Sequence, residues 1–166
     1  MENSDNHYFY RFYVLHSNIT EDNIARLKET IYKFENAALE FLNMNNRFDE
    51  LFKKTKTKAH YSKEIYYKYL VPELFNQYNS IIVSDVDVVF TGDISQDYLK
   101  YSANDKIYLS ACKVLWKKNY SNFHDLYKKY FSDDEIKKLG YAGGYYIFNL
   151  LNMRKDNICN KLIEFT

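Results

Sequence analysis

The sequence has little of what usually marks linkers, repeats or disulfide-bonded folds. Its 166 residues include one proline, four glycines and two cysteines. No Ser- or Pro-rich stretch separates two halves, so we expect one continuous domain over residues 1–166. Cys112 and Cys159 lack CxxC spacing and the density of a secreted disulfide scaffold. They are therefore expected to be reduced, buried thiols in a cytoplasmic protein.

An excess of charge of one sign is also absent. The chain has 23 basic and 22 acidic residues, and no basic face indicates nucleic acid as a partner. Residues 1–6 are polar and lack the basic start and apolar run of a signal peptide. No apolar run approaches the roughly 20 residues that cross a bilayer, so any membrane contact should be peripheral.

The pattern of apolar residues predicts strands that alternate with helices. Strands are expected at 7–15, 80–84, 88–90, 107–112 and 145–148, and at 37–44, where a helix is the alternative. Helices are expected after Thr20 and from 63 to 77, near 123–130 and 134–139, and from about 153. This order predicts a Rossmann-like α/β fold with a mainly parallel sheet flanked by helices. Ligands in such sheets bind beyond the carboxyl ends of the strands.

Two carboxylates interrupt the most apolar part of the chain. Asp85 and Asp87 lie one residue apart within the run from Ile81 to Phe90. Burying an unpaired carboxylate costs several kcal/mol, so the pair should reach solvent at a strand end or neutralise a cation. Oxygen ligands suit Mg²⁺ or Mn²⁺, and such an ion keeps positions open for nucleotide phosphates.

The surrounding residues make this motif more specific. Residues 61–98 resemble the signature region of glycosyltransferase family 8: 61–74 resemble the helix before its DxD strand, and 92–94 resemble the turn after it. Downstream, the stretch 143–150 followed by Arg154 is similar to a family strand that leads into a helix with a basic residue. The resemblance runs in order over most of the chain and implies an incomplete GT-A fold.

The resemblance implies a reaction and a metal. Members of this family transfer a hexose from a UDP-sugar to a saccharide or lipid-linked saccharide acceptor, with retention of anomeric configuration. By that match Asp85 and Asp87 would hold Mn²⁺, with Mg²⁺ as the alternative ion. The expected setting is lipopolysaccharide or cell-surface polysaccharide synthesis in a bacterial cytoplasm, peripheral to the inner membrane.

The resemblance also suggests which residues contact the donor. Lys68 stands where the family usually has an arginine near the donor, and Val86 lies between the two aspartates. Gly143 and Gly144 would let the backbone pass close to the sugar. The alternatives are a solvated helix lysine and a plain structural turn. No catalytic nucleophile can be assigned.

The chain departs from the family pattern in several places. Ser84 replaces a bulky residue, and Ala142 stands where an asparagine contacts the sugar. The family's first strand and its carboxy-terminal His-x-x-Gly-x-x-Lys motif, which supplies the third metal ligand, have no counterpart. The chain's histidines lie outside such a context and are expected to be ordinary surface or partly buried residues: His7, His16, His60 and His124.

Two other functions fit parts of the sequence. A haloacid-dehalogenase-like phosphatase would use Asp85 as nucleophile and Asp87 as acid/base. Against it, that motif normally opens a chain, and the pair Asp133-Asp134 follows no buried strand. The other alternative is a catalytically silent remnant or interaction module, which could self-associate through an exposed sheet edge.

Overall fold

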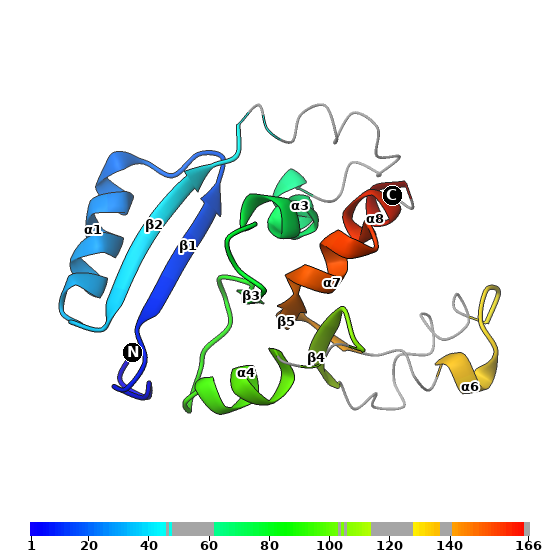
Figure 1. Ribbon diagram of the computed structural model, residues 1–166. Coiled ribbons are helices and arrows are strands. Elements are labelled where there is room, and N and C mark those ends of the chain that lie inside the picture. The colour runs from blue at the N-terminus through cyan, green and yellow to red at the C-terminus, as the bar shows by residue number, and fades with distance from the viewer. Residues whose placement is uncertain are drawn as a thin grey trace.

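The computed structural model describes residues 1–45, 47, 62–102, 104, 106–113, 128–136 and 141–164, with only the backbone at 141 and 142. Strands and helices alternate along the chain, as Figure 1 shows. Their order is β1 (Tyr10–His16), α1 (Glu21–Tyr32), β2 (Ala37–Asn43), η1 (Lys63–Tyr66), α3 (Tyr67–Leu74), β3 (Ser80–Ser84), α4 (Ser95–Ser102), β4 (Leu109–Lys113), α6 (Asp133–Ile136), β5 (Tyr141–Asn149), α7 (Leu150–Lys155) and α8 (Ile158–Glu164).

The described strands form two small sheets. In the first, β1 and β2 are parallel, with Phe12 opposite Leu39. In the second, the order is β3-β5-β4, and β5 runs antiparallel to both neighbours. The predicted α/β architecture is confirmed. The pairing is mixed where a mainly parallel sheet was expected, because β5 runs opposite to the two strands that it joins.

The β1–α1–β2 unit is a parallel crossover joined by a capped helix. Thr20 precedes α1, and its Oγ1 accepts a hydrogen bond from the Asn23 amide at 3.4 Å. Glu21 and Asp22 add negative charge to the first turn, where the helix dipole favours it. However, α1 has no buried residue. This unit therefore has little apolar cover of its own.

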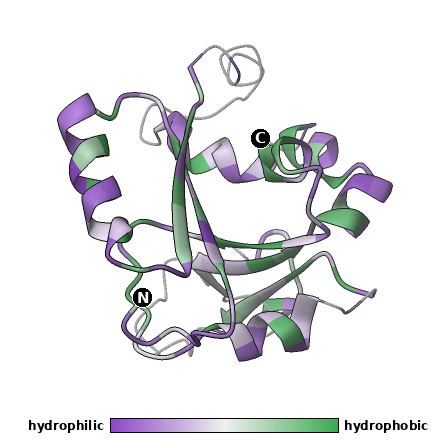
Figure 2. Cartoon of the chain, turned by 60° about the vertical axis from the view of Figure 1, so that its left-hand side comes forward, coloured by the Kyte–Doolittle hydropathy of each residue, from purple (hydrophilic) through white to green (hydrophobic). Residues whose placement is uncertain are grey.

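The main core lies between α3, β5 and α7. It consists of five buried residues: Val71, Phe75, Phe148, Leu150 and Met153. A second cluster joins the end of β2 to η1 and α3 through Met44, Tyr66, Tyr67 and Leu70. Figure 2 shows apolar residues along the strands and on the helices that cover them, with polar residues on most of α1.

Several predicted elements match, and others differ for local reasons. The strands at 80–84 and 37–44 are confirmed. The helix predicted at 63–77 is split into η1 and α3 and ends at Leu74. Residues 88–90 belong to no described strand, and most of 123–130 lies outside the described residues. The closing helix begins at Leu150, because Asn149 caps it by accepting from the Asn152 amide at 3.0 Å.

Two predictions about this part of the chain were incomplete or wrong. Helix α4 was not predicted, although Asp93 marks its start by accepting from the Ser95 amide at 3.1 Å. Both thiols are free, but only Cys159 is buried, whereas Cys112 on edge strand β4 is exposed. Burial raises the pKa of the Cys159 thiol to about 11.

Arg154 ties α7 to the chain just before β3. Its guanidinium donates to the carbonyls of Pro72 at 3.0 Å, Phe75 at 3.5 Å and Tyr78 at 2.9 Å. These carbonyls belong to the last turn of α3 and the loop after it, where helical partners run out. One side chain therefore fixes where β3 begins.

Replacing this guanidinium should destabilise the fold. We expect Arg154→Met to lower the free energy of unfolding by about 3 kcal/mol, because several carbonyls lose a charged donor. Chemical denaturation measures the change. The adjacent Lys155→Met, which removes an exposed charge, should change it by less than about 0.5 kcal/mol. Equal effects of the two substitutions would contradict this role for Arg154.

Candidate functional site

Asp85 and Asp87 reach solvent where β3 ends. The Asp85 amide donates to the Gly144 carbonyl at 2.8 Å, which holds this residue against β5. The chain then turns through Val86 and Asp87. The Val88 amide closes this turn by donating a hydrogen bond to the Asp85 carbonyl at 3.4 Å. Both aspartates are exposed, and so is Val86. A strand-end position explains how two carboxylates fit into an apolar run.

Lys68 comes from α3 to the same place. Its Nζ lies 3.6 Å from Asp85 Oδ1 and donates to the Gly143 carbonyl at 3.4 Å. It also lies 5.5 Å from the centre of the Tyr146 ring. The lysine side chain is only 19% exposed, so it is not a solvated surface lysine. The structure thus brings together Lys68, Asp85 and both glycines, which are separated by up to 76 positions in sequence but were predicted as one site.

The two glycines are not equivalent. A Cβ at Gly144 would lie 3.1 Å from Val88 Cγ2 and 3.6 Å from Asp85 Oδ2. At Gly143 the nearest atom would be the Tyr146 hydroxyl at 3.7 Å, an ordinary contact. Only Gly144 is therefore required for close packing, and what it packs against is the turn that carries the aspartates.

Tyr146 is a member of this site that the sequence did not single out. It follows the glycines on β5 and contacts Lys68 with its ring. Burial, with a smaller contribution from the charge of Asp85, raises the pKa of Tyr146. Its hydroxyl therefore stays neutral at ordinary pH. The sequence feature that could have pointed to Tyr146 is its position in the stretch 143–150, two residues after Gly144.

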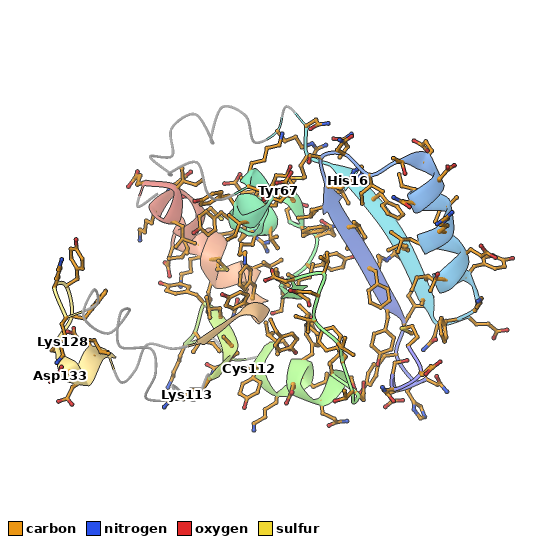
Figure 3. All side chains as sticks on the ribbon, turned by 180° about the vertical axis from the view of Figure 1, so that it is seen from behind. His16, Tyr67, Cys112, Lys113, Lys128 and Asp133 are labelled. Carbon is orange, nitrogen blue, oxygen red and sulfur yellow. The ribbon has the colours of Figure 1, made fainter. Side chains whose placement is uncertain are left out.

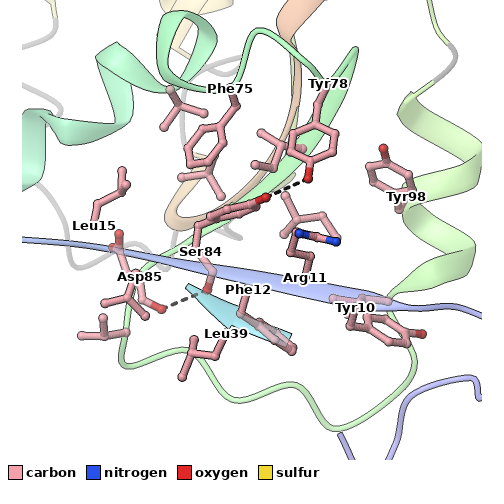
Figure 4. Close-up of a pocket in the computed structure, with 18 of the residues that line it drawn as sticks. Tyr10, Arg11, Phe12, Leu15, Leu39, Phe75, Tyr78, Ser84, Asp85 and Tyr98 are labelled. Atoms are coloured by element: carbon pink, nitrogen blue, oxygen red, sulfur yellow. Dashed lines mark hydrogen bonds between the residues drawn. The ribbon is translucent and has the colours of Figure 1, made fainter. Parts of the chain in front are cut away.

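A cavity of about 910 Å³ adjoins these residues and extends between β1 and β3. Ser84, Asp85 and Lys68 are among the residues that line it. Figure 4 shows Leu15 and Asp85 on one side, with Tyr10 and Tyr98 on the other. The rest of the wall is largely aromatic and aliphatic. Lys68 and Asp85 lie at the carboxyl end of β3, where a ligand of an α/β sheet is expected, and two other charged residues, Arg11 and Glu64, also line the cavity.

The carboxylates suit a hard divalent ion. Among the described residues, no group of three His, Cys, Asp or Glu side chains could enclose a metal. Two exposed carboxylates, of which Asp85 lies 3.6 Å from Lys68 Nζ, nevertheless fit Mg²⁺ or Mn²⁺, which is commonly held by one or two carboxylates together with substrate phosphates. His7 contacts Asp5, and His16 packs near Phe41. His60, His124 and the Ala142 side chain lie outside the described residues.

The sequence profile of Glycosyl transferase family 8 matches residues 1–166. The chain belongs to this family. The haloacid-dehalogenase interpretation of Asp85 is thereby corrected. Asp133 lies in the short helix α6, on the far side of the molecule from β1, and Lys128 contacts it there (Figure 3). A search of curated proteins found no match.

Solved structures share the fold at low sequence identity. The WbbM bifunctional glycosyltransferase is 20% identical with a TM-score of 0.71, and the match covers 98% of this chain and 30% of that one. Mouse xyloside xylosyltransferase 1 is 13% identical with a TM-score of 0.66, covering 96% and 60%. The galactosyltransferase LgtC, solved with donor and acceptor sugar analogs, is 19% identical with a TM-score of 0.60, covering 87% and 49%.

These likenesses confirm the expected GT-A-like α/β fold. The family 8 chain described here spans less than two thirds of the length of each of these structures. Among its described residues, no helix has the length and apolar character needed to cross a bilayer.

The difference between the two glycines can be tested directly. Gly144→Ala should displace the turn and shift the NMR signals of the Asp85 amide and the Val88 methyls, because the added carbon would lie 3.1 Å from Val88. Gly143→Ala is the control and should leave these signals near their original positions. Similar shifts in both variants would mean that Gly144 does not support the turn.

Proposed function

We propose that this family 8 chain carries the donor site of a retaining glycosyltransferase, which moves a hexose from a UDP-sugar to a saccharide or lipid-linked saccharide acceptor. The observation that carries the proposal is the meeting of Lys68, Asp85 and Gly144 at the carboxyl end of β3. Cationic and carboxylate groups at a strand end suit a metal-bound diphosphate better than they suit a neutral ligand.

Each residue has a distinct role in this proposal. Asp85 and Asp87 would hold Mn²⁺ or Mg²⁺, and the bound ion would neutralise the negative charge that develops on UDP as it leaves. Lys68 approaches a phosphate as a point charge, without the two-pronged geometry of an arginine. Gly144 allows the turn to pack against β5, and exposed Val86 offers its backbone and side chain to the donor.

Other features of the reaction rest on family membership. Retention, the hexose and the saccharide acceptor are proposed because the chain belongs to family 8 and because LgtC was solved with donor and acceptor sugar analogs. The proposed setting is lipopolysaccharide or cell-surface polysaccharide synthesis in the cytoplasm, peripheral to the inner membrane. No residue is assigned as a nucleophile.

A second candidate function is an interaction module with little turnover of its own. The specific observation that favours it concerns two strands that line the same cavity: among the described strands, β1 pairs only with β2, and β3 pairs only with β5. Robust sugar transfer by the isolated 166 residues would contradict this candidate.

The donor site can be tested without knowing the acceptor. Calorimetric titration of UDP should show binding that strengthens at least tenfold when Mn²⁺ is present, because the ion would offset the repulsion between the diphosphate and the two carboxylates. Asp85→Asn should abolish that gain. Asp22→Asn, which changes an exposed aspartate on α1, should preserve it. A manganese-independent affinity that is unchanged in Asp85→Asn would rule out the proposed metal site.

The role of Lys68 can be separated from that of the metal. With Mn²⁺ present, Lys68→Met should weaken UDP binding about tenfold, the equivalent of about 1.4 kcal/mol. Its affinity for uridine, which lacks phosphates, should not change. Lys161→Met on α8 serves as the control for loss of one positive charge. Equal losses for UDP and uridine would mean that Lys68 supports the fold and does not contact phosphate.

A further inference from the structure

The aromatic ring of Tyr146 lies beside the charged end of Lys68. The Lys68 Nζ atom is over the face of this ring, 5.5 Å from its centre. A cation within about 6 Å of the centre is attracted by the negative charge on the ring face. The attraction is stronger where water is excluded, and the Lys68 side chain is mostly buried. The ring therefore contributes to the position of the ammonium group.

The polar contacts of Lys68 are too long to fix its ammonium group by themselves. Nζ lies 3.6 Å from Asp85 Oδ1 and 3.4 Å from the Gly143 carbonyl oxygen. A strong hydrogen bond from an ammonium group to a carboxylate measures about 2.7–2.9 Å. The position of Nζ thus depends on several moderate attractions acting together, and the loss of one of them would release the group toward solvent.

The contact between Lys68 and Asp85 would weaken in the proposed function. The Asp85 carboxylate would then bind a divalent ion, whose positive charge offsets the attraction of the carboxylate for the lysine. The Gly143 carbonyl and the Tyr146 ring would remain, because both belong to β5. An aromatic face attracts a cation without requiring a directed N–H group, so the ammonium group keeps donors for a phosphate.

The position of the Tyr146 ring is itself fixed by the middle strand of the sheet. Tyr146 lies opposite Val83 on β3 and opposite Ala111 on β4, so a strand flanks it on each side. Its ring packs against Phe148, with 5.6 Å between the ring centres, and against the main core. The side chain of a lysine is flexible along its four-carbon stem. The rigid partner in this pair is therefore the ring.

We propose that Tyr146 is a positioning residue of the donor site: the face of its ring holds the Lys68 ammonium group within reach of the donor phosphates. This inference rests on the proposed function and adds a residue to it. Because the ring face carries the effect, the hydroxyl is not needed. A phenylalanine at this position should therefore be sufficient.

Calorimetric titration in the presence of Mn²⁺ tests this role. Tyr146→Leu, which removes the ring, should weaken UDP binding about fivefold, whereas Tyr146→Phe should change it by less than about twofold. Uridine binding should not change in either variant, because Lys68 contacts phosphate. In a Lys68→Met background, Tyr146→Leu should cause no further loss of UDP affinity, because the ring acts through the lysine.

A substitution of matched shape separates electrostatic attraction from packing. A trifluorinated phenylalanine has nearly the shape of phenylalanine, but its fluorine atoms withdraw negative charge from the ring face. At position 146 it should bind UDP about threefold more weakly than Tyr146→Phe does. The control is Tyr101→Leu on α4, which removes a ring that lies 5.0 Å from Lys100 Nζ and should leave UDP binding unchanged.

The contact between ring and lysine can also be followed without UDP. Protons that lie over the face of an aromatic ring have NMR signals shifted upfield. The ε-methylene signals of Lys68 should therefore move downfield in Tyr146→Leu and stay near their original positions in Tyr146→Phe. Comparing Tyr146→Phe with the trifluorinated ring keeps the test valid if Tyr146→Leu impairs folding.

Three results would overturn the role of Tyr146. The trifluorinated ring could support UDP binding as well as phenylalanine does, which would mean that only the shape of the ring matters. Tyr146→Leu could weaken UDP and uridine binding equally, which would assign the ring to support of the fold. It could also strengthen UDP binding, which would mean that the ring withholds Lys68 from phosphate. A failure of the proposed function would look different, because Lys68→Met itself would then leave UDP binding unchanged.

Discussion

The hydrogen bond from the Asp85 amide to the Gly144 carbonyl is the contact on which the site depends. It ends the β3–β5 ladder and fixes the turn that carries both aspartates. Arg154 fixes the other end of β3 by binding the carbonyls before it. With the strand held at both ends, Lys68 from α3 can meet the Asp85 carboxylate at 3.6 Å. A lysine and a carboxylate are thereby brought together at the carboxyl end of β3.

The two halves of the molecule differ in how completely they are packed. The β3–β5–β4 sheet shares a buried core with α3 and α7, whereas α1 buries no residue and β1 leaves Phe12 37% exposed. The contacts between the halves near the cavity are side-chain contacts, such as the Tyr13 and Tyr78 hydroxyls at 2.8 Å. A backbone ladder between β1 and β3 is absent from the described strands.

Much of the site could be predicted, because its residues lie in short motifs with strong local signals. The apolar run before Asp85 predicted β3, and the family resemblance added Lys68 and the glycines. The sequence could not show in which direction the strands pair. Strand β5 runs antiparallel to β3, and this depends on how distant segments come together in the fold. Helix α4 was missed because its apolar content is weak, although Asp93 and Ser95 carried a capping signal. The cavity depends on the edges of two distant strands, which no local pattern records.

The central claim is that Asp85 and Asp87 hold a divalent ion against UDP. Paramagnetic broadening by Mn²⁺, recorded on the NMR amide signals with UDP present, tests it most directly because the effect falls steeply with distance from the ion. The account predicts that signals of residues 85–88 and Gly144 broaden first and recover when Mg²⁺ displaces Mn²⁺. Broadening centred on another acidic cluster, such as α6, with residues 85–88 unaffected, would contradict it.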